Sequence, residues 1–153
     1  MVTVISPRYG NESGLVVSGD AKALTAVDFN QDGRADFFIS RNNSSAVAFQ
    51  NQMQSSAATG SPVSVQLIGP ASNPSAVGAK GFLFRDDGSQ QSAEVYAGSG
   101  YLYQSTPVLF LSTSAKNKAT EWLIRWPDGK RTKHPVGTDS IQTLRRDPGL
   151  PIE

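Results

Sequence analysis

Two observations predict that this sequence folds as an all-β protein. Apolar and polar residues alternate with a period of two along almost the whole chain, and no window long enough for a helix has a convincing period of 3.6. The composition agrees, because 14 glycines and 9 prolines in 153 residues are typical of a chain with many β-turns. With 38% hydrophobic and 18% charged residues, the chain is too apolar to be disordered.

The composition also excludes several classes of function. The absence of cysteine and the single histidine rule out a disulfide framework, a thiolate nucleophile and a zinc centre built on cysteines or several histidines. A net charge of +1 gives no long-range field that would attract nucleic acid, so we expect no nucleic-acid partner. We expect no membrane insertion either, because no run approaches the roughly 18 apolar residues of a membrane span.

The first predicted domain covers residues 1–52 and contains four short strand-like runs. These are residues 15–18, 24–28, 36–40 and 46–50. Four antiparallel strands of this length resemble one blade of a β-propeller. On the third run, Phe37 and Ile39 should point to one side and Phe38 to the other, so both faces of the blade require cover. We therefore expect association, either with a second copy as a homo-oligomer or with the remaining blades of a longer propeller protein.

The second predicted domain covers residues 63–147, after a linker at residues 53–62 and before a tail at residues 148–153. The linker is predicted because this stretch is polar, small and has almost nothing to bury. Seven strand-like runs follow it, and they predict an antiparallel, β-sandwich-like domain. The runs are residues 63–68, 79–85, 93–97, 107–112, 121–126, 131–136 and 141–144.

The most specific motif is a D-x-N-x-D-G-x-x-D run between the second and third strands of the first domain. A hard cation such as calcium needs about six to eight oxygen ligands, and alternate residues of a tight loop can turn their oxygens inward. Three carboxylates in so short a run would repel one another without a cation. A metal-free turn is the alternative, because Asn, Asp and Gly also favour turns for backbone reasons. The candidate ligands for Ca²⁺ are the side chains of Asp28, Asn30, Asp32 and Asp36 and the backbone carbonyl of Arg34.

The loop and its flanks, Lys22 to Ser40 and Ala46 to Asn51, resemble an FG-GAP repeat, the calcium-binding blade of integrin-type β-propellers. The resemblance covers roughly residues 14–52 and implies that the family's calcium ligands fall on the same five residues. Asn30 stands where many members have Asp, which lowers the charge of the site.

The second domain resembles the ASPIC/UnbV domain, which follows FG-GAP propellers in the cartilage acidic protein family and in bacterial secreted proteins. Among the motifs that carry the resemblance are Val65-Gln-Leu-Ile-Gly69, Asn73-Pro-Ser-Ala-Val-Gly-Ala79 and Ile124-Arg-Trp-Pro-Asp-Gly129. The resemblance implies an extracellular or periplasmic module, with its leader outside this chain, and no enzymatic activity. We therefore expect a non-enzymatic calcium-binding module that binds a protein partner.

Carbohydrate binding is the first alternative function. Trp122 and Trp126 share one strand face, where they form either a sugar-stacking platform or part of the core. The alternative ring contacts for a glycan are Tyr101 and Tyr103, which we expect to be exposed. A basic group could contact an acidic partner or a sulfated glycan, or could be an edge strand protected by charge. It consists of Lys116, Lys118, Arg125, Lys130, Arg131, Lys133 and His134.

A hydrolase with paired carboxylates is the remote alternative. It would require Asp86 or Asp87 in a cleft about 5–10 Å from a second acid such as Glu94 or Glu121. The Asp86-Asp87-Gly88 run by itself is typical of a turn.

Overall fold

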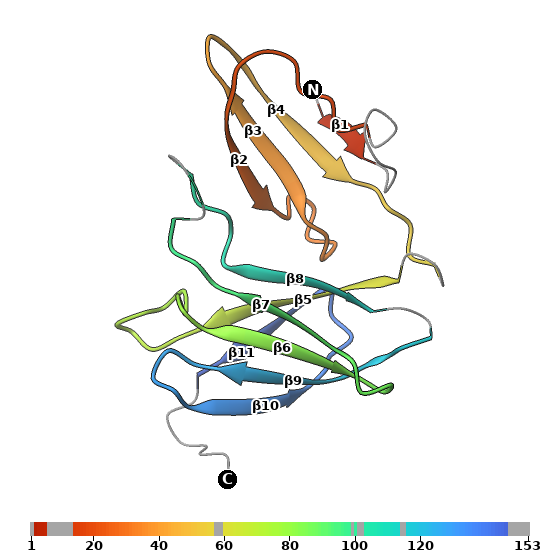
Figure 1. The fold of residues 1–153 in the computed structure, drawn as a ribbon, viewed down its shortest axis with the longest axis vertical. Helices are drawn as coiled ribbons and strands as arrows, with labels where there is room; N and C mark the ends of the chain where they lie inside the picture. The colour runs from red at the N-terminus through yellow and green to blue at the C-terminus, as the bar shows by residue number, and fades with distance from the viewer. Residues whose placement is uncertain are drawn as a thin grey trace. The chain divides into compact units, whose positions relative to one another are not determined.

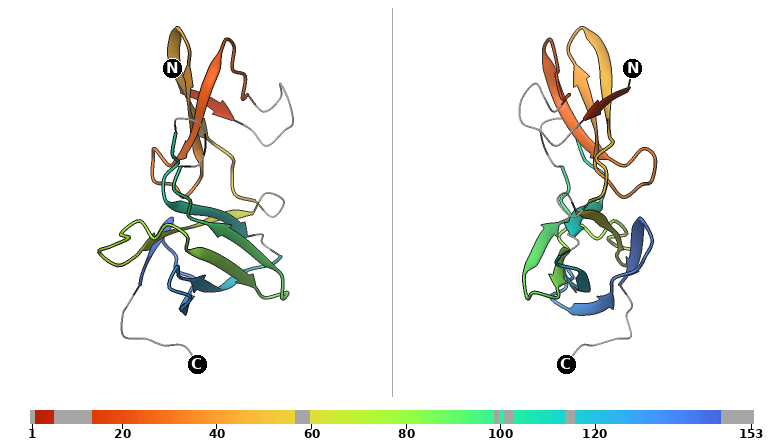
Figure 2. Two further views of the ribbon diagram at one scale, coloured as in Figure 1. Left: turned by 60° about the vertical axis from the view of Figure 1, so that its left-hand side comes forward. Right: turned by 90° about the vertical axis from the view of Figure 1, so that its right-hand side faces the viewer.

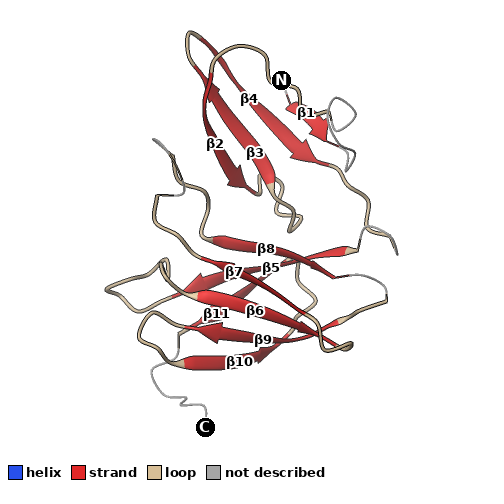
Figure 3. Cartoon of the chain, in the orientation of Figure 1, coloured by secondary structure: helices blue, strands red, loops and turns tan. Residues whose placement is uncertain are grey.

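The structure is a computed structural model. It describes residues 14–56, 60–98, 100, 103–113 and 116–146, and the backbone of residues 2–5. No described residue lies in a helix, which confirms the all-β prediction (Figure 3). It follows that no described helix is long and apolar enough to cross a membrane. The chain divides into two compact units. Unit 1 contains Met1–Gln54 and Gly98–Thr106, and unit 2 contains Ser55–Ala97 and Pro107–Glu153.

Unit 1 is built on one four-stranded sheet with the order β1-β4-β3-β2 (Figure 1). Its strands are β1 (Val2–Ile5), β2 (Ala21–Val27), β3 (Asp36–Arg41) and β4 (Ser44–Asn51). β2, β3 and β4 form an antiparallel meander, whereas β1 pairs with β4 in parallel.

The predicted strand at residues 15–18 is wrong. These residues are described, but they form no strand, and the fourth strand of the sheet is β1 instead. Alternation predicts an extended chain, but a strand also requires a partner with free backbone groups, and the sequence pattern does not show where that partner lies.

A segment that the sequence pattern assigns to the second domain belongs to unit 1. The N–H of Thr106 donates to the carbonyl of Ala26 at 3.0 Å, and the N–H of Ala26 donates to Oγ of Ser105 at 3.1 Å. These bonds cover part of the outer edge of β2. An edge strand has unpaired backbone groups, so this cover stabilises the sheet at Ala26.

Unit 2 contains two sheets, shown from two further sides in Figure 2. The four-stranded sheet has the order β10-β9-β6-β7 and the three-stranded sheet the order β11-β5-β8. All pairs are antiparallel except β11 with β5. The strands are β5 (Ser61–Ile68), β6 (Lys80–Arg85), β7 (Gln90–Glu94), β8 (Val108–Thr113), β9 (Ala119–Arg125), β10 (Arg131–Pro135) and β11 (Ile141–Arg145).

The inward faces of these two sheets form one apolar core. Alternate residues of β5 and β9 are fully buried, as predicted from their patterns. Gly81 on β6 packs tightly against Leu109 on β8, because a Cβ at this position would be 2.8 Å from Cδ1 of Leu109. The buried cluster consists of Val65, Leu67, Ala76, Ala79, Leu83, Val95, Leu109, Trp122, Ile124, Trp126 and Leu144.

Candidate functional site

The acidic loop joins β2 to β3 in unit 1, as the sequence predicts. Asp28 directly follows β2, and Asp36 is the first residue of β3. The chain turns tightly between them because Gln31 and Gly33 have φ angles of 59° and 82°. Glycine adopts this left-handed region without strain, whereas a residue such as Gln31 requires local contacts that hold it there.

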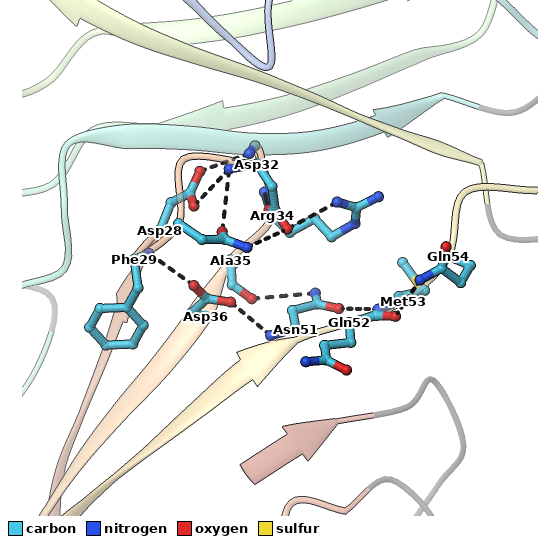
Figure 4. Close-up of polar contacts among 12 residues, drawn as sticks. Asp28, Phe29, Asp32, Arg34, Ala35, Asp36, Asn51, Gln52, Met53 and Gln54 are labelled. Atoms are coloured by element: carbon cyan, nitrogen blue, oxygen red, sulfur yellow. Dashed lines mark hydrogen bonds and ion pairs between the residues drawn. The ribbon is translucent and has the colours of Figure 1, made fainter. Parts of the chain in front are cut away.

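Asp28 closes the loop with both carboxylate oxygens. Oδ1 accepts the N–H of Asp32 at 3.1 Å and Oδ2 accepts the N–H of Gly33 at 2.8 Å (Figure 4). Hydrogen bonds to a carboxylate are stronger than those to a neutral acceptor. Asp28 therefore fixes the backbone that carries the next candidate ligands.

Asn30 and Asp32 contact each other on the loop. Nδ2 of Asn30 donates to Oδ2 of Asp32 at 3.0 Å, and Oδ1 of Asn30 accepts the N–H of Asp32 at 3.3 Å. Asp32 also accepts the N–H of Arg34 at 2.9 Å and forms an ion pair with Nη1 of Arg34 at 3.1 Å. Partial burial raises the pKa of Asp32, but the hydrogen bonds from Asn30 and Arg34 outweigh it, so the pKa lies below its ordinary value. The side chain is therefore a carboxylate at neutral pH.

Asp36 is fully buried and contacts a different part of the backbone. Its Oδ2 accepts the N–H of Phe29 at 2.9 Å, and its Oδ1 accepts the N–H of Asn51 at 2.7 Å. The side chain of Asn51 in turn donates to the carbonyl of Ala35 at 3.3 Å. Asp36 thus connects the acidic loop to the end of β4, as Figure 4 shows.

A polar pocket of about 210 Å³ lies beside the loop, within unit 1. Sequence reasoning did not identify its second wall, because residues 50–54 meet the loop only through the pairing of β3 with β4. The run of amide side chains that ends β4 was the available signal. The lining residues are Asn30, Asp32 and Arg34 from the loop and Gln50, Asn51, Gln52, Met53 and Gln54 from the end of β4.

The carboxylate, amide and carbonyl oxygens of this loop are the ligand atoms that a hard cation prefers. The structure brings Asp28, Asn30 and Asp32 together. The side chains of Asp28 and Asn30 both accept the N–H of Asp32, and Nδ2 of Asn30 donates to the Asp32 carboxylate. The side chain of Asp36 is separate from this group, and its carboxylate accepts the N–H groups of Phe29 and Asn51. Within the described part of the chain, no group of three acidic or imidazole side chains is arranged to hold a metal by itself. Amide and carbonyl oxygens would therefore have to complete any coordination shell.

The two tryptophans belong to the core. Trp122 and Trp126 are buried to 0% and 2% exposure, so neither ring face is available to a sugar. Nε1 of Trp126 donates to Oγ1 of Thr132 at 2.8 Å, which fixes its ring. Of the two tyrosines, Tyr103 is half-buried and Tyr101 lies outside the described residues.

The candidate acids of a hydrolase lie on different elements. Asp86 and Asp87 occupy the exposed turn between β6 and β7, where Asp87 accepts the N–H of Ser89 at 2.8 Å. Glu94 ends β7, and Glu121 on β9 forms an ion pair with Nζ of Lys133 at 3.0 Å. None of these acids lines the polar pocket beside the acidic loop.

Comparison with known protein families finds a match over most of unit 2. The family model described as ASPIC and UnbV matches residues 69–149, slightly more than half of the chain. A search of curated protein sequences finds no match. The matched residues include most of the strands of unit 2 and its buried tryptophans.

Proposed function

The chain belongs to the ASPIC and UnbV family, and from this premise we propose that it is a non-enzymatic, calcium-binding extracellular module that mediates association with a protein partner. Unit 1 is then an FG-GAP-like, propeller-type blade whose loop between β2 and β3 holds calcium. The partner is the remaining blades of a longer propeller protein or a second copy of the chain.

The distribution of exposed apolar side chains carries the proposal of association. Six large hydrophobic residues are exposed in the described part of the chain, and five of them lie in unit 1: Leu15, Val16, Leu24, Phe29 and Phe38. The sixth is Tyr96 in unit 2. Exposed apolar side chains concentrated on one small unit are typical of an interaction surface.

Both faces of the unit 1 sheet contribute to this group. Leu24 pairs with Ile39 across β2 and β3, whereas Phe38 pairs with Thr25 and therefore points to the opposite face. Leu24 is 37% exposed and Phe38 is 42% exposed. A blade within a propeller has neighbours on both faces, so exposure on both sides supports the propeller-type partner.

The acidic loop supports the proposal of calcium binding. Asp28, Asn30 and Asp32 provide carboxylate and amide oxygens, the backbone carbonyl of Arg34 provides another, and Asp36 contributes directly or through water. A carboxylate oxygen that accepts one N–H retains a lone pair for a cation. The bound ion would hold the loop together and neutralise its charge.

The association is tested by light scattering on the purified chain, with Phe38→Ser as the variant. We expect the wild-type chain to self-associate and Phe38→Ser to shift it towards the monomer. Lys22→Ser, an exposed change on the neighbouring strand β2, is the matched control and should leave the molar mass unchanged. A wild-type chain that stays monomeric at high concentration, and that does not bind a propeller lacking its last blade, contradicts the proposal.

Calcium binding is tested by calorimetric titration of the chelator-treated chain. We expect binding heat with calcium, less with magnesium, and loss of both with Asp32→Ala. The matched control is Asp87→Ala, which removes an exposed acid from a turn in unit 2. No heat and no change in melting temperature at millimolar calcium would overturn this part of the proposal.

A further inference from the structure

The outward face of the four-stranded sheet in unit 2 carries a row of positive charges across three neighbouring strands. Arg131 on β10 lies directly opposite Arg125 on β9, and Arg125 lies directly opposite Lys80 on β6. The next positions along, Ile124 and Gly81, are buried in the core. Because side chains alternate between the two faces of a strand, the three cations share the outward face.

Without a ligand, this row of like charges lowers the stability of the sheet. Like charges directly opposite each other on neighbouring strands destabilise a sheet. In the part of the chain that the structure describes, neither Arg125 nor Arg131 forms an ion pair within 4.0 Å. Both side chains are exposed, so both guanidinium groups are accessible to a ligand.

Neighbouring side chains compensate the positive charge of the row only at Lys80. Glu94 lies opposite Lys80 on β7, and the amino group of Lys80 leans over the ring of Phe82, 5.4 Å from its centroid. Glu121 is already paired with Lys133. The two arginines at the β9 and β10 positions are therefore the uncompensated part of the row.

Apolar side chains lie beside the row on the same face. Phe82 is paired with Leu123, and Phe84 lies two residues further along β6. All three are half-buried, so each exposes part of its surface without forming a deep groove. A flat face with partly exposed apolar side chains next to guanidinium groups suits a ligand with alternating apolar ring faces and anionic groups.

We propose that this face binds a sulfated linear polysaccharide, with Arg125 and Arg131 as the anion-binding residues. A guanidinium group matches the oxygens of a tetrahedral oxyanion in a planar, two-donor geometry. The inference extends the proposed function to unit 2 and depends neither on calcium nor on Phe38.

The spacing favours a polysaccharide over an acidic peptide. Neighbouring strands are about 4.8 Å apart, so a ligand that engages both arginines crosses the strands with closely spaced anions. Acidic side chains on one face of an extended peptide are about 6.5 to 7 Å apart, a wider backbone spacing than that of the row. One sugar ring can carry more than one sulfate group, which provides closely spaced charges.

The test compares Arg125→Glu with the wild-type chain on immobilised heparin, together with calorimetry on a heparin oligosaccharide at physiological salt. We expect the affinity to fall about tenfold or more, as for the loss of a charge-assisted contact. The melting temperature should rise, because a glutamate at this position lies between Lys80 and Arg131 and replaces repulsion by attraction. Loss of binding together with a more stable fold cannot result from misfolding.

Lys118→Glu is the matched control, since it makes the same change in net charge at an exposed site that precedes β9. It should retain heparin binding. Equal loss in Lys118→Glu and Arg125→Glu would show a diffuse charge effect and overturn the proposal, as would competition by polyglutamate as strong as that by heparin. If Arg125→Glu does not fold, Arg131→Glu on the edge strand β10 provides the same test.

Discussion

The two units bury different kinds of side chain. Unit 2 has a continuous apolar cluster contributed by both of its sheets. In unit 1 the buried hydrophobic residues of the described part are Ile39 and Phe49, and a carboxylate, Asp36, is fully buried as well. Unit 2 is thus stabilised mainly by the hydrophobic effect, whereas unit 1 buries fewer apolar side chains and depends more on hydrogen bonds to acidic side chains.

The difference between the two cores affects where each unit can carry a functional site. A unit with a complete core can carry charges on its outer face that weaken it slightly, because burial provides stability elsewhere. A ligand that binds only the folded state of a unit stabilises the unit that carries its site, by an amount that depends on the ligand's concentration and dissociation constant. We therefore expect calcium and a partner to affect unit 1 more than unit 2.

The largest expected effect is the loss of core packing in unit 2. Trp122→Ala should destabilise this unit by about 3 to 5 kcal/mol, through lost burial and the cavity that remains. Urea denaturation followed by Trp126 fluorescence measures it. Leu123→Ala is the control, since this half-buried neighbour points outward and should cost less. Equal effects of the two variants would contradict the assignment of Trp122 to the core.

The second effect concerns the buried carboxylate of unit 1. Asp36→Ala leaves the N–H groups of Phe29 and Asn51 without their acceptor and should destabilise unit 1 by about 2 to 3 kcal/mol. Hydrogen exchange of the β3 and β4 amides measures the change. Asp20→Ala is the control, because this exposed carboxylate forms a surface ion pair with Lys22. A change no larger than that of Asp20→Ala would show that Asp36 does not hold the loop.

Calcium should raise the free energy of unfolding by a smaller amount, and only in unit 1. At ten times its dissociation constant, a ligand that binds only the folded state stabilises it by about 1.4 kcal/mol. We expect slower amide exchange in β2, β3 and β4 and no change in β6 or β9. The same protection in both units, or protection that persists in Asp32→Ala, would contradict binding at the loop.

The smallest effect is a pH dependence of unit 2 through His134. This ring is half-buried on β10, and desolvation lowers its pKa below the ordinary value of 6.5. The unfolded state then binds a proton more readily than the folded state. The stabilisation is complete above about pH 6.5 and is lost as the pH falls through the lower folded-state pKa. Thermal unfolding between pH 8 and pH 5 should therefore show a loss that His134→Gln reduces, and a loss unchanged in that variant would assign the effect to other groups.

Much of the fold of unit 2 could be predicted from the sequence. Apolar residues stand at alternate positions in two strands, Val65 and Leu67 in one and Trp122 and Ile124 in the other. Because residues two positions apart share one face of a strand, this pattern predicts which faces are buried. The turn of Trp126-Pro-Asp-Gly-Lys130 was predictable for a local reason, since Pro and Asp-Gly favour a tight turn, and Gly129 has the positive φ, 82°, that glycine adopts there. The structure places the turn between β9 and β10, where the N–H of Trp126 donates to the carbonyl of Lys130 at 2.8 Å.

The candidate site was predictable only in part. Spacing alone indicates that Asp28, Asn30 and Asp32 share one tight loop, because they are two residues apart and a glycine, Gly33, follows directly. Spacing does not show that Asp36 contacts Asn51, which is 15 residues further along the chain. The pocket wall from Gln50 to Gln54 was missed for the same reason, since its residues meet the loop only through the pairing of β3 with β4.

By itself, the sequence determined the all-β class, the buried faces of β5 and β9 and the position of the acidic loop. These features depend on local periodicity and turn chemistry, which are properties of neighbouring residues. The tertiary structure alone decided that β1 rather than residues 15–18 completes the first sheet, that Ser105 and Thr106 bond to Ala26, and that Lys80, Arg125 and Arg131 form one row. Each of these depends on which distant strands exchange backbone hydrogen bonds, and every strand has the same donors and acceptors to offer, so the choice of partner is made by the packing of the whole chain.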